Sequence, residues 1–356
     1  MVRFSDIVKN GATKEKESDR PKESERQSEP FRFSNLEELR SSIDKEIAVP
    51  ETRQDIEKTR KTCLAFHNYI KEVRARVVDN KLFEIEPALI MIGKIVDMPD
   101  MIKKIYQYAV HFSYEEDYLI SYPTNILACV LKIGQSMGYS KTELLELGLS
   151  ALLYDVGMFM VPEDIIKKKG ELNDSEVTLI RKHPETGRDI LSMFKEEHPL
   201  LHRVAYEHHE RENGQGYPRG LKGDEICEYA KITGMVDTYV AMISNRPHRK
   251  AMMQHTSVRE LIWSKNLLFS SKIIKAFIKE ISLYPVGSYV KLNNKTTGVV
   301  VDTNEENPMK PVVKLLFDGK ENVLTEKSMV KLDETPLLYI VDSVSREEIP
   351  SKINPL

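Results

Sequence analysis

The spacing of apolar residues divides the chain into a long helical part and a short strand-rich part. From about residue 31 to residue 111, apolar side chains recur at steps of three and four, the period of an amphipathic helix. From 112 to 283 the helical pattern continues behind marked helix starts. We expect capping boxes at Ser140-x-x-Glu143 and Asn173-x-x-Glu176, and a further helix start at Ser257-x-x-Glu260.

The last 70 or so residues have the pattern of strands. Short β-branched runs separated by Asn, Asp, Gly and Pro predict strands at Tyr289–Leu292, Gly298–Asp302, Val312–Phe317 and Leu337–Val341. At the other end, residues 14–30 hold 11 charged side chains and no aliphatic or aromatic one. Such a segment buries too little apolar surface to order itself, so we assign residues 1–30 to a disordered tether.

We therefore predict a mainly α protein in four parts. The tether is followed by a helical N-terminal module at 31–111 and a helical domain at 112–283. A small antiparallel β domain occupies 284–356. A Gly- and Pro-rich loop at 213–220 interrupts the helical domain.

Composition excludes several classes of protein. Lys and Arg (52) nearly balance Asp and Glu (55), so no basic field indicates a nucleic-acid polymer as partner. The three cysteines are scattered without CxxC spacing, which argues against a disulfide scaffold and a thiolate zinc site. No apolar run approaches the roughly 20 residues that cross a bilayer, and no secretory signal is recognisable. We expect a cytoplasmic protein.

Candidate chemistry is concentrated in the helical domain. Five of the nine histidines lie between residues 183 and 209, and His208 and His209 are adjacent. Asp155 and Asp237 each follow an apolar helical stretch, where a buried carboxylate needs a cation or several donors. Imidazoles with carboxylates suit Zn, Fe or Mn. We interpret four further histidines as surface or packing residues; they are His198, His202, His248 and His255.

The order of these motifs resembles the HD-GYP family, a branch of the HD phosphohydrolases that acts on cyclic di-GMP. The resemblance covers about residues 115–283 and is carried by Tyr154-Asp-Val-Gly-Met158, His183-Pro-Glu-Thr-Gly187, His208-His-Glu-Arg-Glu-Asn-Gly-Gln-Gly-Tyr-Pro218, Asp237-Thr-Tyr-Val-Ala-Met and Asn245-Arg-Pro-His-Arg249. It implies an all-helical domain holding two or three iron or manganese ions that promote in-line attack on phosphorus.

The resemblance also implies roles for individual residues. Asp155 matches the bridging carboxylate on which catalysis depends. The other implied metal ligands are His183, His208, His209 and Asp237. The implied substrate-binding residues are Arg246, Arg249, Gly216 and Tyr217, the last two in the GYP loop at 213–220.

The sequence departs from the family at three functional positions. Tyr154 replaces the histidine of the HD pair, Tyr122 stands where an earlier histidine ligand belongs, and Met158 replaces a phosphate-binding lysine. Both tyrosines fall on ligands of the same metal, so we expect at most one tightly held ion, Fe or Mn, with two less favoured. We expect the tyrosines to fill the vacated volume and to hydrogen-bond Asp155 or Asp237; phenolate ligation of ferric iron is the alternative.

These observations leave three functional hypotheses. The first is a degenerate HD-GYP protein that binds metal and cyclic di-GMP but hydrolyses it weakly or not at all. The second is an active phosphodiesterase that releases pGpG or GMP. The third is a scaffold that contacts protein partners through the GYP loop and the β domain. The sequence is also compatible with a homodimer.

Overall fold

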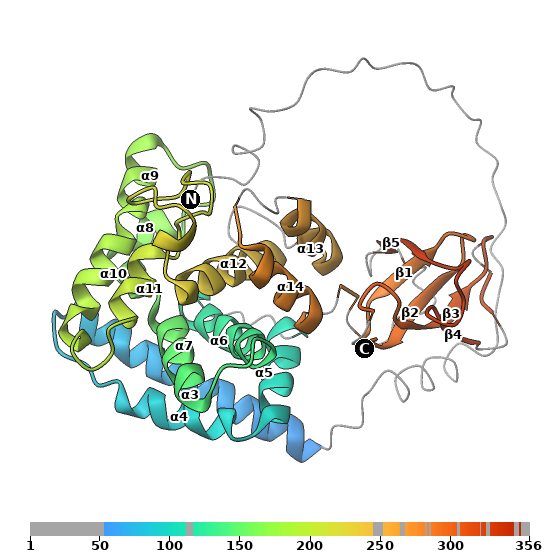
Figure 1. Ribbon diagram of the computed structural model, residues 1–356, viewed down its shortest axis with the longest axis horizontal. Coiled ribbons are helices and arrows are strands. Elements are labelled where there is room, and N and C mark those ends of the chain that lie inside the picture. The colour runs from blue at the N-terminus through green and yellow to red at the C-terminus, as the bar shows by residue number, and fades with distance from the viewer. Residues whose placement is uncertain are drawn as a thin grey trace.

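The computed structural model describes residues 53–111, 117–244, 252–263, 268–281, 283–284, 286–304, 307–320, 322–324, 328–344 and 349 (Figure 1). The predicted tether, the first part of the N-terminal helical module, and the predicted substrate-binding residues Arg246 and Arg249 lie outside these residues. So does His248.

Helices make up the described chain as far as residue 280. They are α3 (Arg53–Val78), α4 (Glu86–Val96), α5 (Pro99–His111), α6 (Tyr118–Ser136), α7 (Lys141–Leu153), α8 (Glu163–Ile166), α9 (Asp174–Arg181), α10 (His183–Leu191), α11 (Leu201–Glu207), α12 (Glu228–Ile243), α13 (Gln254–Trp263) and α14 (Ser271–Glu280). Short 3₁₀ turns occur at η1 (Val156–Met160), η2 (Ser192–Phe194) and η3 (Gly223–Glu225). The mainly α fold is thereby confirmed.

Two of the three predicted helix starts are confirmed. Ser140 and Asn173 each accept the backbone N–H of a glutamate three residues on, whose carboxylate reaches back to the cap. The third is wrong: α13 begins at Gln254, and the buried Ser257 hydroxyl donates to the Met253 carbonyl inside the helix. A serine can hydrogen-bond back to residue i−4, so the capping pattern alone does not fix a helix start.

The helices pack around one continuous apolar core. Figure 1 shows α3 and α4 running along one side of the body, below α6 and α7. Phe66 of α3, Ile92 of α4 and Ile105 of α5 share this core with Ile126 of α6 and Leu147 of α7, all of them fully buried. Helix α3 also packs against η1. The described N-terminal helices therefore support the elements that carry the candidate site.

The C-terminal part is a five-stranded antiparallel sheet in the order β4-β3-β2-β1-β5. Its strands are β1 (Tyr289–Leu292), β2 (Thr297–Asp302), β3 (Val312–Phe317), β4 (Met329–Lys331) and β5 (Ile340–Val344). The predicted last strand begins three residues later than expected, and β4 was missed because a three-residue edge strand carries too little alternation. Val290, Val300 and Val313 join the core cluster that contains the helical residues.

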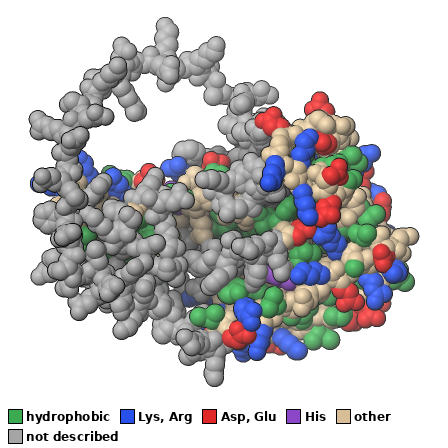
Figure 2. Space-filling model, turned by 180° about the vertical axis from the view of Figure 1, so that it is seen from behind, with side chains coloured by type: hydrophobic (Ala, Val, Ile, Leu, Met, Phe, Trp, Pro, Cys, Tyr) green, Lys and Arg blue, Asp and Glu red, His purple; other side chains and the backbone are tan. Residues whose placement is uncertain are grey.

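Helix length and surface charge were both compared with the expectations from the sequence. No helix among the described residues has the length and apolarity that a membrane crossing requires. On the face shown in Figure 2, acidic and basic side chains are interleaved over the coloured part of the molecule.

Candidate metal centre

Four of the five candidate ligands lie at or near helix ends. Helix α7 finishes at Leu153, so Tyr154 caps it, and Asp155 is the N-cap residue just before η1. His183 is the first residue of α10, and His208 caps α11 with His209 directly after it. Asp237 differs from the sequence expectation: it lies inside α12, which continues to Ile243, because the apolar pattern does not stop at the aspartate.

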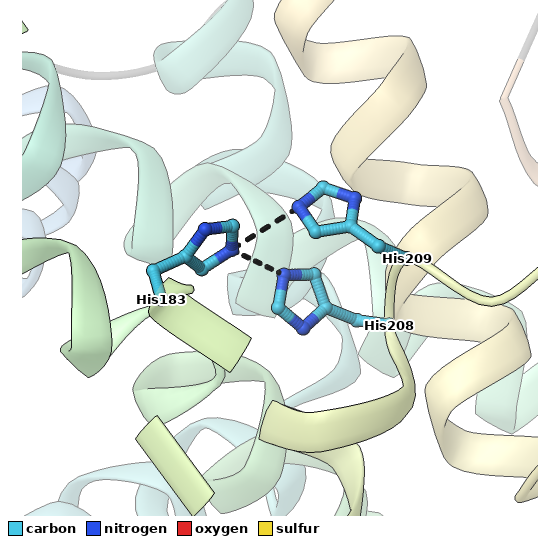
Figure 3. A group of neighbouring side chains, drawn as sticks. All are labelled: His183, His208 and His209. Atoms are coloured by element: carbon cyan, nitrogen blue, oxygen red, sulfur yellow. Dashed lines mark hydrogen bonds between the residues drawn. The ribbon is translucent and has the colours of Figure 1, made fainter. Parts of the chain in front are cut away.

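The three predicted histidine ligands converge on one point (Figure 3). The His183 Nε2 atom lies 3.2 Å from His208 Nε2 and 3.1 Å from His209 Nε2. One nitrogen from each ring lies within 4.8 Å of the other two. His183 and His208 are buried, while His209 is partly exposed. Segments 25 residues apart along the chain are thus brought together as a trigonal set of nitrogen donors.

Backbone carbonyls fix the ring orientation of two of these histidines. His183 Nδ1 lies 2.6 Å from the Ile180 carbonyl oxygen and His208 Nδ1 lies 2.8 Å from that of Ala205. A carbonyl can only accept, so both Nδ1 atoms carry the proton and both Nε2 atoms carry a lone pair. The same second contact orients imidazole ligands in metal sites.

This tautomer assignment tests whether the cluster fits a metal. The lone pairs of His183 Nε2 and His208 Nε2 face each other, and Asp155 Oδ1 lies 3.3 Å from His183 Nε2 as a third acceptor. A proton on His209 Nε2 satisfies only one such contact. A cation in the middle satisfies all of them, and the nitrogen and oxygen donors suit a divalent transition metal.

Burial keeps these rings neutral. It lowers the pKa of His183 to about 3, helped by the neighbouring His208, and lowers the pKa of His208 to about 3. The pKa of His209 is also well below the ordinary value, first through burial and then through the other two rings. Neutral imidazole is the form that ligates metal, so the site does not have to release protons at pH 7 to bind one.

Of the two tyrosines, Tyr154 makes a hydrogen bond to one of the two expected carboxylates. The Tyr154 hydroxyl donates to Asp237 Oδ1 at 2.8 Å, and its ring packs edge-on against His208. Tyr122 is buried in α6 with its ring against Tyr118. Tyrosines therefore occupy the side of the site next to Asp237.

A small cavity of about 40 Å³ separates the histidines from the tyrosines. Tyr122, Tyr154, Met158 and Asp237 line it together with Asp155, His183, His209 and Tyr217. Since one water occupies roughly 30 Å³ in the liquid, the cavity accommodates an ion and about one water. Met158 is buried and offers no charge.

The GYP loop packs directly on the histidine cluster. Tyr217 stacks on His209 with ring centroids 4.6 Å apart, and the Arg181 guanidinium lies 5.1 Å from the Tyr217 ring centre. Gly214 has a φ of +76°, which favours glycine. Gly216 is required for space, because a Cβ there would lie 2.4 Å from the Glu210 Cα.

Two glutamates that the sequence interpretation missed hold this loop. The buried Glu210 carboxylate accepts the backbone N–H groups of Arg219 and Leu221, at 2.7 and 2.9 Å. Glu207, also buried, accepts from the Arg219 guanidinium and the backbone N–H of Cys227. The one available sequence signal for Glu210 was its position directly after the histidine pair.

Comparisons with known proteins agree with this geometry. Residues 107–269 match the family model described as "HD domain", and residues 289–352 match "KOW domain associated with HD domain". The chain is 30% identical over 224 residues to cyclic di-GMP phosphodiesterase PA4108 of Pseudomonas aeruginosa, covering 63% of this chain and 54% of that protein. It is 29% identical over 216 residues to cyclic di-GMP phosphodiesterase PdeB of Borreliella burgdorferi, covering 60% and 57%. The chain thus spans little more than half the length of these relatives.

A solved structure has the same fold. Bd1817, an HDG"Y"P protein from Bdellovibrio bacteriovorus, superposes with a TM-score of 0.53 at 16% identity, covering 68% of this chain and 79% of that one. The converging histidines, the GYP loop and these matches point the same way: this chain carries an HD domain and is similar in sequence to cyclic di-GMP phosphodiesterases.

Proposed function

We propose that the HD domain holds one divalent metal, iron or manganese, and binds cyclic di-GMP with hydrolysis that is weak or absent. His183, His208, His209 and Asp155 hold the ion. The names of the relatives support the nucleotide, since both are cyclic di-GMP phosphodiesterases. The match of residues 107–269 to an HD domain supports metal binding.

One observation carries the proposal of a single ion. The Tyr154 hydroxyl donates to Asp237 Oδ1, so a neutral phenol occupies the carboxylate that a second metal needs. A phenol with an ordinary pKa near 10 is a poor ligand at neutral pH. A pair of metals clamps both the attacking and the leaving oxygen of a phosphodiester, and one metal does not.

The residues around the single ion have separate tasks. When bound, the metal supplies Lewis acidity to a phosphate oxygen or a water. The neutral imidazoles supply the donors, and Asp155 supplies negative charge on the cavity side. Arg181, exposed beside Tyr217, offers a guanidinium to a phosphate at the mouth of the cavity. Met158 offers no charge to a phosphate, so the site stabilises the transition state of hydrolysis less than a site with a cation at this position.

Elemental analysis combined with nucleotide assays tests this proposal. Protein purified without chelator should contain one Fe or Mn per chain, bind cyclic di-GMP in calorimetry, and release little or no pGpG or GMP when Mn or Fe is added. Two metals with turnover would show an active phosphodiesterase instead. Absence of both metal and nucleotide binding would favour a scaffold.

A variant that rebuilds the missing ligands makes the test sharper. The combination Tyr122→His, Tyr154→His and Met158→Lys should raise the metal content toward two and increase hydrolysis by at least tenfold. The matched control is Tyr154→Phe, which removes the hydroxyl from Asp237 without adding a ligand and should leave one metal. A folded triple variant with one metal and unchanged turnover would refute the ligand assignment.

A further inference from the structure

A large apolar groove lies on the N-terminal helices, away from the residues that line the metal site. It has a volume of about 990 Å³ and is lined by residues of α3 and α4 and by Met98 and Met101. Its apolar lining includes Ile56, Ala65 and Met91. Ile56 is 41% exposed and Met98 is 37% exposed, so side chains that belong in a core face outward here.

The rim of the groove is predominantly basic. Of its described lining residues, Lys58, Lys61 and Lys94 are basic and Glu57 alone is acidic. An apolar floor with a basic rim fits an amphipathic helix whose apolar stripe is flanked by carboxylates.

The chain itself contains such a segment immediately before α3. In residues 34–48, Leu36, Leu39, Ile43 and Ile47 recur at steps of three and four, which places them on one face of a helix. Glu37, Glu38, Asp44 and Glu46 outnumber Arg40 and Lys45, giving the segment two excess negative charges. Ser34-x-x-Glu37 is a capping-box pattern, and Pro50 favours a helix end before it.

The length of the chain permits this segment to fold back onto the groove. Four residues, 49–52, separate it from α3, which begins at Arg53; antiparallel helix hairpins use loops of about 2–5 residues. A helix over 36–48 would be about 18 Å long at 1.5 Å per residue. The groove runs along α3 from Ile56 to Phe66, about 15 Å on the same measure.

We propose that residues 36–48 form an amphipathic helix that packs antiparallel to α3 and fills this groove. Leu36, Leu39, Ile43 and Ile47 cover the exposed apolar side chains, and the acidic residues face the lysines of the rim. Ala65 is exposed on α3 and leaves room for a larger side chain from the segment. The inference is independent of the metal site and of its activity.

Hydrogen–deuterium exchange on the full chain tests the proposal. Amides of residues 38–47 should exchange at least tenfold more slowly than in an unstructured peptide of that sequence. The double change Leu39→Asp and Ile43→Asp should abolish this protection. The matched control, Ser34→Asp with Ser41→Asp, adds the same two charges at the cap position and on the opposite face, and should retain the protection.

A second variant tests the groove rather than the segment. Ala65→Glu adds a charged side chain at an exposed position of α3, so the body should stay folded, yet protection of residues 38–47 should be lost. Exchange of the wild-type segment at the unstructured rate would overturn the proposal. So would protection that disappears on dilution together with a dimer seen by light scattering, because the occupant would then be a second copy.

Discussion

Gly157, two residues after Asp155, has almost no room for a side chain. A Cβ at this position would lie 2.0 Å from the carbonyl oxygen of His183 and 2.7 Å from the backbone nitrogen of Gly187. Real Cβ contacts essentially never fall below 3.0 Å, so Gly157→Ala must move η1 and α10 apart by at least 1.0 Å, the difference between 3.0 and 2.0. That movement separates Asp155 from His183.

The cost of this movement can be bounded. Overpacking a tight contact typically costs about 1–3 kcal/mol, and each kcal/mol lowers the Tm of a domain of about 200 residues by roughly 2–4 °C. We therefore expect the metal-free Gly157→Ala protein to melt about 2–12 °C lower. Metal sites tolerate displacements of only about 0.5 Å, so the Kd for Mn should rise by at least about tenfold.

An equivalent substitution elsewhere supplies the control. Gly170 has no heavy atom within 4 Å of a Cβ and no positive φ, so Gly170→Ala should leave both quantities unchanged. Differential scanning calorimetry and a Mn titration below the melting range measure them separately. The reasoning is refuted if Gly157→Ala matches Gly170→Ala in both Tm and Kd.

Three further predictions follow from the contacts of the site. Tyr154→Phe should lower the free energy of unfolding by about 1 kcal/mol in urea titrations, because a partly buried carboxylate loses its donor. After metal removal, stability should fall as the pH drops below 6.5 toward about 3: folded His183 and His208 stay neutral there, whereas the unfolded chain takes up protons. Each ring contributes up to about 1.4 kcal/mol per pH unit, so urea midpoints should decrease from pH 7.5 to pH 5. Glu210→Ala should speed amide exchange in the loop at 213–220 at least tenfold, since two backbone N–H groups lose their acceptor; unchanged exchange would contradict that role.

Much of the fold and of the histidine cluster could be predicted because the signals are local. The capping boxes at Ser140 and Asn173 are complete within four residues, and both formed as expected. The strand runs at Tyr289–Leu292 and Val312–Phe317 likewise contain their own pattern. Where the deciding contact was elsewhere, prediction failed: Ser257 has the same local pattern, but its helix begins three residues earlier.

The contacts that hold the loop at 213–220 could not be predicted, for a different reason. Nothing in the sequence around Glu210 says that its carboxylate accepts two backbone N–H groups from residues 219 and 221, because that contact depends on how the loop returns. The requirement for glycine at position 216 could not be predicted for the same reason, because only the folded loop brings the Glu210 backbone close to it. Arg246 and Arg249, beyond the described residues, stay predictions.

The orientation of two histidines of the cluster, His183 and His208, is set by local contacts. His183 and His208 each bond a carbonyl three residues before them, in their own turn of chain. These bonds do not involve Asp237, Tyr122 or Tyr154, so the orientation of the two rings does not depend on which side chains stand at positions 122 and 154. On the other side of the site, the Tyr154 hydroxyl donates a hydrogen bond to Asp237. A domain built this way can lose one metal position and keep the other, whereas a site in which both ions shared their orienting contacts would lose both together.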